Sequence, residues 1–174
     1  MWERFKELLE DPEVLDVLIF GSTVRGKQTP SDLDVCVIWK GRKRAVPGAI
    51  SKTYAELFSP DFLAREDVLS DAFSLRLNKR LAEAFGYDSF VGFMYSLRRK
   101  DYNERARFHN ALRNISKELE ILRFKGFALV PVAVSEKFKD FLEYWKVPFR
   151  ETRILFPKQE YEFLQGKKIE ETLL

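Results

Sequence analysis

Two carboxylates, Asp32 and Asp34, stand one residue apart at the start of the apolar run DLDVCVIW. Because side chains alternate along a strand, both acids share one face, with Cα atoms about 6.6 Å apart. They repel each other there, and burial of either adds a further cost. Mg²⁺ binds one or two protein carboxylates and completes its shell with water and phosphate oxygens. The pair therefore indicates a site for a metal ion carrying a triphosphate.

The loop before this strand contains residue types that bind phosphate. Gly21 ends the apolar run VLDVLIF and allows a sharp backbone turn, Ser22 offers a hydroxyl and an N–H group, and Arg25 offers a charged fork. The loop GSTVRGKQTPS lacks both the Lys followed by Ser or Thr of the nucleoside triphosphatases and the glycine pattern of dinucleotide-binding proteins. We therefore expect a phosphate-binding loop of another kind.

A motif is formed by the pair GS, a spacer of nine residues and the triplet DLD. It resembles the motif of the DNA polymerase beta-like nucleotidyltransferase superfamily. The stretch FGSTVRG followed by SDLDV is most similar to its small prokaryotic members, the minimal nucleotidyltransferases. The resemblance is tight over about residues 15–39; beyond residue 50 the chain is similar to uncharacterised archaeal-type proteins. The large body of a CCA-adding enzyme is absent.

This resemblance implies the roles of four residues. Gly21 and Ser22 bind the triphosphate of an NTP, with ATP the first choice, and Asp32 and Asp34 bind Mg²⁺ or Mn²⁺. A third carboxylate on a later strand often completes such a site and activates the acceptor hydroxyl. Asp88 is the candidate here, because it opens a predicted strand after a predicted helix.

The remaining sequence predicts alternating helices and strands. We expect helices over 2–10, 54–65 with a break at Pro60, 70–86, 101–123 and 135–147; strands over 14–20, 32–39, 89–97, 127–134 and 150–156; a loop over 40–52; and a polar helical tail over 158–174. The fold class is α+β: a nucleotidyltransferase-type mixed sheet flanked by helices, followed by a C-terminal α/β extension. We place the division between residues 1–99 and 100–174, unless both form one continuous body.

Composition excludes several classes. The chain has 174 residues with 45% hydrophobic and 33% charged content, and no apolar run approaches the roughly 20 residues that span a bilayer. A single cysteine, Cys36, cannot form an internal disulfide, and a single histidine, His109, leaves no Cys/His set for structural zinc. The opening MWERFKELLEDPEV is unlike a secretory signal, so we expect a cytoplasmic protein.

Some residues admit a plainer interpretation. Cys36 fits a small buried hydrophobe better than a nucleophile, and His109 fits a structural or solvated role. Two basic clusters could guide RNA or could simply be solvated. They comprise Lys40, Arg42, Lys43, Arg44 and Lys52, and Arg98, Arg99, Lys100, Arg105 and Arg107.

Three functions stay open at this point. The leading one is a metal-dependent nucleotidyltransferase with an unidentified acceptor, which could be RNA, a protein or a small molecule. The second is an antitoxin-like enzyme that adenylylates a protein hydroxyl. The third is a degenerate member that binds nucleotide, RNA or a protein partner without chemistry. The sequence leaves the base preference and homo-oligomer formation open.

Overall fold

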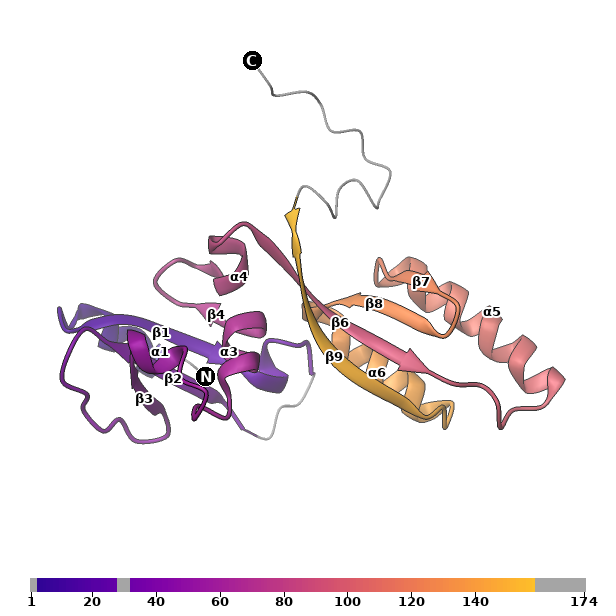
Figure 1. Cartoon of the computed structure of the whole chain (residues 1–174), viewed down its shortest axis with the longest axis horizontal. Coiled ribbons are helices and arrows are strands. Elements are labelled where there is room, and N and C mark those ends of the chain that lie inside the picture. The colour runs from indigo at the N-terminus through magenta and orange to yellow at the C-terminus, as the bar shows by residue number, and fades with distance from the viewer. Residues whose placement is uncertain (1–2, 28–31, 159–174) are drawn as a thin grey trace, which may run out of the picture.

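The computed structural model describes residues 3–27 and 32–158, which form two β-sheets with helices packed against them (Figure 1). The first sheet has the strand order β3-β2-β1-β4-β5. Its strands are β1 (Val14–Phe20), β2 (Asp34–Trp39), β3 (Ile50–Thr53), β4 (Phe73–Ser74) and β5 (Lys79–Arg80). The sheet is mixed, because β3 runs parallel to β2 while the other neighbours are antiparallel.

The two central strands of the first sheet are buried on both faces, which explains their nearly continuous apolar sequences. Cys36 and Ile38 of β2 belong to one apolar cluster with Val68. Val35 and Val37 point to the opposite face and pack with Trp39. By the same alternation, Asp34 lies on the Cys36 face, which is covered by α3 (Arg65–Asp71).

The other short helices surround this sheet or join its strands. They are α1 (Glu3–Lys6), the 3₁₀ turns η1 (Glu7–Glu10) and η2 (Gly21–Thr23), α2 (Tyr54–Leu57) and α4 (Leu81–Ala84). Phe5 of α1 is buried in the cluster that contains Trp39. The helix predicted over 2–10 is therefore present, but as a short α-helix followed by a 3₁₀ turn.

The second sheet is antiparallel and has the order β7-β8-β6-β9. Its strands are β6 (Tyr87–Tyr95), β7 (Leu122–Phe124), β8 (Phe127–Pro131) and β9 (Phe149–Pro157). The 3₁₀ turn η3 (Val132–Val134) leads into α6 (Ser135–Tyr144), which packs with α5 (Tyr102–Glu118) in one core. Phe108 of α5, Phe138 of α6 and Phe93 of β6 are fully buried there.

Helix α3 connects the two sheets, because it contacts both β1 and β9 (Figure 1). The Ser89 hydroxyl of β6 also donates a hydrogen bond to the carbonyl of Ser70 in α3. The chain crosses from the first sheet to the second between α4 and β6. The division of the chain near residue 99 stays a prediction.

The predicted α+β class is confirmed, but the helix predicted over 70–86 is wrong. Residues 73–80 form a β-hairpin whose turn contains Asn78 with φ +50°. The periodicity of the apolar residues suits a helix, but β4 instead pairs with β1, and the Ser74 hydroxyl donates to the Asp16 carboxylate at 2.5 Å. Long-range pairing thus overrides local helix propensity here.

Smaller differences concern element ends. The loop predicted over 40–52 contains most of β3, and the helix predicted over 101–123 stops at Glu118, so that β7 can form. Apart from Lys158, the predicted tail over 158–174 lies outside the described residues. No helix within the described ranges is long and apolar enough to cross a membrane.

Candidate active site

Gly21 and Asp34 touch across the ends of β1 and β2. Phe20, the last residue of β1, pairs with Asp34, the first residue of β2, so the next residue turns beside the carboxylate. A Cβ atom on Gly21 would lie 2.1 Å from Asp34 Oδ2, and Gly21 has φ +74°. Both the space and the backbone conformation therefore require glycine. The close approach holds the Asp34 carboxyl against the start of the loop that follows β1.

Ser22 lies in the 3₁₀ turn that follows, with its hydroxyl uncommitted to any hydrogen bond with the described residues. Its carbonyl accepts from the Lys27 N–H at 3.2 Å, which closes the loop. The partly buried Arg80 guanidinium donates to the carbonyls of Val24 and Asp71 at 2.8 and 2.9 Å, and burial lowers its pKa. Arg80 thus ties the loop to α3, while the Ser22 hydroxyl stays available to a ligand.

Asp32 and Asp34 are both exposed, with Asp34 at the first position of β2 and Asp32 two residues before it. Partial burial raises the pKa of the Asp34 carboxyl, and the neighbouring carboxylates Asp32 and Asp67 raise it further. Two like charges and a close backbone leave Asp34 short of positive charge. A hard divalent cation would supply that charge, and carboxylate oxygens are ligands that Mg²⁺ and Mn²⁺ prefer.

Asp67 is an acid near this site that sequence reasoning did not select. It lies in the first turn of α3, where capping by an acidic residue explains its presence without a ligand. Its Oδ1 atom accepts a hydrogen bond from Arg153 Nη2 of β9 at 2.9 Å. The only available signal was the spacing of Asp67 and Asp71, four residues apart on one helical face.

Asp71 lies on that face and is completely buried. Its Oδ2 atom is 2.9 Å from Arg153 Nε, and Oδ1 accepts from the Ser70 hydroxyl at 2.6 Å. Burial raises the pKa of Asp71 despite the opposing effects of Ser70, Arg153 and Arg25. Burial alone would lower the pKa of Arg153, but Asp71 and Asp67 act in the opposite direction and raise it overall. These ion pairs join α3 to the second sheet.

Arg25 faces the second sheet and its helices. Its Nη2 atom lies 2.8 Å from Glu151 Oε2 in β9 and 3.1 Å from Glu136 Oε1 in α6, and its Nε donates to the Ser135 hydroxyl at 3.2 Å. The hydrogen bond and charge of Arg25 lower the pKa of Glu151, although burial works the other way. The guanidinium is therefore committed to two carboxylates, and these contacts give no support to its predicted phosphate role.

Asp88 lies half-buried in β6, opposite Phe156 of β9. The carboxylates that act on the pKa of Asp34 are Asp32 and Asp67, and Asp88 is not among them. Across residues 3–27 and 32–158, no group of three or more His, Cys, Asp or Glu side chains could hold a metal ion. The structure thus brings together Gly21, Ser22, Asp32 and Asp34, and offers no third metal ligand from its described part.

A glycine turn facing an acid pair, at the edge of a mixed sheet covered by helices, is the arrangement that the GS and DLD motif predicted. Residues 1–121 match the family described as Nucleotidyltransferase domain, and the chain belongs to this family. The match spans the first sheet, β6 and α5, and ends before β7. It confirms the predicted resemblance and supports nucleotidyl transfer as the general activity. No curated protein and no solved structure matched the sequence.

Proposed function

We propose that the protein is a metal-dependent nucleotidyltransferase that moves NMP from an NTP to an acceptor hydroxyl. ATP is the first candidate for the NTP. The observation that carries the proposal is the contact between the Gly21 backbone and the Asp34 carboxylate, beside a second acid, Asp32. The same contact gives a triphosphate access to backbone N–H groups and to carboxylate-bound metal at one point.

In the proposed reaction, the acceptor oxygen attacks the α-phosphorus and forms a new P–O bond. The bond between the α-phosphorus and the bridging oxygen breaks, and the electron pair leaves with pyrophosphate. Bound Mg²⁺ would neutralise charge on the attacking and leaving oxygens. Asp32 and Asp34 would hold the ion, while Gly21 and Ser22 would orient the phosphates.

The acceptor proton requires a separate base. Asp67 is the stronger candidate among the acids near Asp34, because it is partly exposed and acts on the Asp34 carboxyl. Its Oδ1 atom accepts a hydrogen bond from Arg153, so it would have to exchange this partner for the acceptor hydroxyl before it could take the proton. Asp88 stays a prediction for the same role.

A degenerate member that binds NTP without chemistry is the second candidate function. The observation in its favour is that the described residues offer no third metal-ligating side chain beside Asp32 and Asp34. Such a protein would still need both acids and Gly21 for metal-dependent binding. Both candidate functions therefore require metal-dependent NTP binding, and only the first includes transfer of NMP to an acceptor.

The deciding experiment incubates the protein with Mg²⁺ and each of the four NTPs labelled at the α-phosphate. Acceptors are total RNA, a protein extract and small hydroxyl compounds, in separate reactions. We expect the label to enter one acceptor class with stoichiometric release of pyrophosphate, and Asp34→Asn to abolish both. Metal-dependent NTP binding without label transfer would favour the degenerate member, and absence of NTP binding would refute both.

A further inference from the structure

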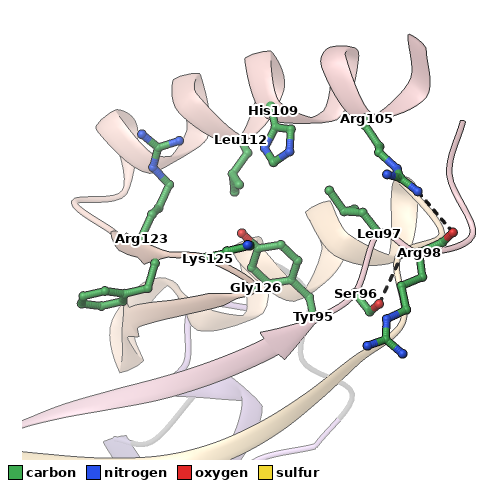
Figure 2. A pocket seen from close by; sticks show the side chains of 11 residues that line it. Tyr95, Ser96, Leu97, Arg98, Arg105, His109, Leu112, Arg123, Lys125 and Gly126 are labelled. Carbon is green, nitrogen blue, oxygen red and sulfur yellow. Dashed lines mark hydrogen bonds between the residues drawn. The ribbon is translucent and has the colours of Figure 1, made fainter. Parts of the chain in front are cut away.

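A groove of about 790 Å³ is lined by α5 and by the turn that joins β7 to β8 (Figure 2). These elements lie at the opposite end of the molecule from β2 (Figure 1). Arg105 and His109 project into it from α5, Tyr95 lies on the opposite side, and Arg123 stands at the other end from Arg105. The hairpin side lies beyond residue 121, where the family match ends.

The groove lining is cationic. Arg98, Arg105, Arg123 and Lys125 line it together with His109, and no Asp or Glu does. Within the described residues, none of the four cations forms an ion pair with a carboxylate. Arg105 donates only to backbone carbonyls, including that of Lys100 at 2.8 Å. Four basic side chains thus line the groove, and no acidic side chain of the described ranges lines it.

The charge of the whole chain is concentrated around this groove. Residues 95–126 contain nine Lys or Arg and four Asp or Glu, a net charge of +5, whereas the whole chain carries +3. The rest of the chain is therefore slightly acidic, with net −2. A local excess of this kind attracts a polyanion that extends beyond the groove itself.

Aromatic side chains accompany these charges. Phe124 of β7 is 54% exposed on the hairpin, between Arg123 and Lys125 in sequence. Tyr95 is half-buried and lines the groove together with Arg123. Burial raises the pKa of its hydroxyl, and the charge of Arg123 opposes this rise. An exposed aromatic ring flanked by cations offers stacking to a base and pairing to its phosphates.

We propose that this groove binds a single strand of nucleic acid. Only unstacked bases can present their faces to Phe124, which favours a single strand over a duplex. An acidic peptide would satisfy the cations but would leave the aromatic rings without a partner. The site is separate from the acid pair, because β6 runs about 20 Å from Ser89, which contacts α3, to Tyr95 in the groove. Binding therefore requires neither NTP nor metal.

The test measures fluorescence anisotropy of a labelled oligonucleotide of about 12 residues, as RNA and as DNA, without NTP or Mg²⁺. Salt is varied between about 50 and 200 mM. Arg123→Ala/Lys125→Ala should weaken binding at least about tenfold, and should reduce the salt slope by about 1.4 because each lost phosphate contact on a single strand removes about 0.7. Phe124→Ala should weaken binding at least about fivefold with an unchanged salt slope. All three side chains are exposed, so these variants should fold.

The matched control is Arg113→Ala/Lys117→Ala, which removes an exposed Arg and Lys from α5 outside the groove lining. It removes the same charge from residues 95–126 without removing a groove contact, so it should weaken binding clearly less than the groove variant does. Asp34→Asn should bind as the parent does, which separates this proposal from the nucleotidyltransferase one. Equal affinity of the groove variant and the control would overturn the proposal. Absence of binding would also overturn it. The proposal would likewise fail if duplex, heparin or polyglutamate competed as strongly as the unlabelled single strand does. Preference between RNA and DNA identifies the strand.

Discussion

At the scale of single residues, the site depends on Gly21, whose backbone touches the Asp34 carboxylate. Gly21→Ala should abolish metal-dependent NTP binding, because its Cβ would lie 2.1 Å from Oδ2 and displace the acid. Gly86→Ala is the matched control: Gly86 has φ +81°, and no atom lies within 4 Å of its added Cβ. Each should lose about 1 kcal/mol or more of stability from the left-handed backbone. Calorimetric titration with Mg-NTP checks the difference, and equal loss of binding in both would contradict this role for Gly21.

Asp34 should cost stability while it supports binding. Its pKa in the folded protein lies above the ordinary value of 3.8, so the folded carboxyl binds protons more tightly than the unfolded one. The cost is absent below pH 3.8 and complete above the folded-state pKa. Asp34→Asn should therefore be at least as stable as the parent at pH 7, with an advantage that disappears in acid, and should lose Mg-NTP binding.

Thermal unfolding from pH 3 to 8, measured without metal, checks this expectation. A variant that is less stable than the parent at pH 7 would mean that the Asp34 carboxylate forms favourable contacts in the folded protein. A variant that keeps the parent's affinity for Mg-NTP would place the metal elsewhere.

At the scale of elements, Arg25 joins the loop that follows β1 to α6 and β9. Arg25→Met should destabilise the fold by about 3 kcal/mol, because it leaves Glu136 and Glu151 without their shared cation in a largely buried position. The control Arg44→Met breaks the exposed pair with Asp11 and should cost less than about 1 kcal/mol. Urea unfolding measures both. If Arg25→Met instead keeps full stability and loses affinity for NTP over NMP, Arg25 binds phosphate as the sequence predicted.

The elements that position the acids could be predicted from sequence because their patterns are local. The runs before Gly21 and after Asp32 are apolar on both faces, and the structure contains both as central strands. The hairpin β4–β5 could not be predicted in the same way. Its residues are held by partners about sixty positions earlier, such as Asp16 for the Ser74 hydroxyl and Leu15 for Arg76.

The same distinction applies to the site. Gly21, Ser22, Asp32 and Asp34 lie within one short motif, and the chain's own β1–β2 pairing brings them together. The surroundings of Arg25 and Asp67 depend on residues of β9, 126 and 86 positions away. A single sequence gives no signal for such pairs, so the ion pairs of Arg25 with Glu136 and Glu151 could not be predicted.

At the scale of the whole molecule, ion pairs join α3 to β9, and Arg25 joins the loop after β1 to α6 and β9. These pairs predict that the chain unfolds as one cooperative unit. Trp39 is buried in the first sheet, and Trp145 packs against the core of the second. Two variants each retain a single tryptophan, Trp39 or Trp145, with the others changed to Phe. In each variant, the urea midpoint of tryptophan fluorescence should equal the urea midpoint of the circular dichroism of the same variant. A fluorescence midpoint that differs from the circular dichroism midpoint of the same variant would mean that the sheets unfold independently.

The central claim is that Asp32, Asp34, Gly21 and Ser22 bind a metal-NTP complex. A crystal structure of the protein with Mg²⁺ and a non-hydrolysable NTP tests it most directly, with Mn²⁺ in a parallel crystal to locate the metal by its anomalous signal. We predict metal about 2.1 Å from oxygens of both acids, with the triphosphate against the Gly21 and Ser22 backbone. A nucleotide bound elsewhere, or a metal that leaves both carboxylates uncoordinated, would contradict the account.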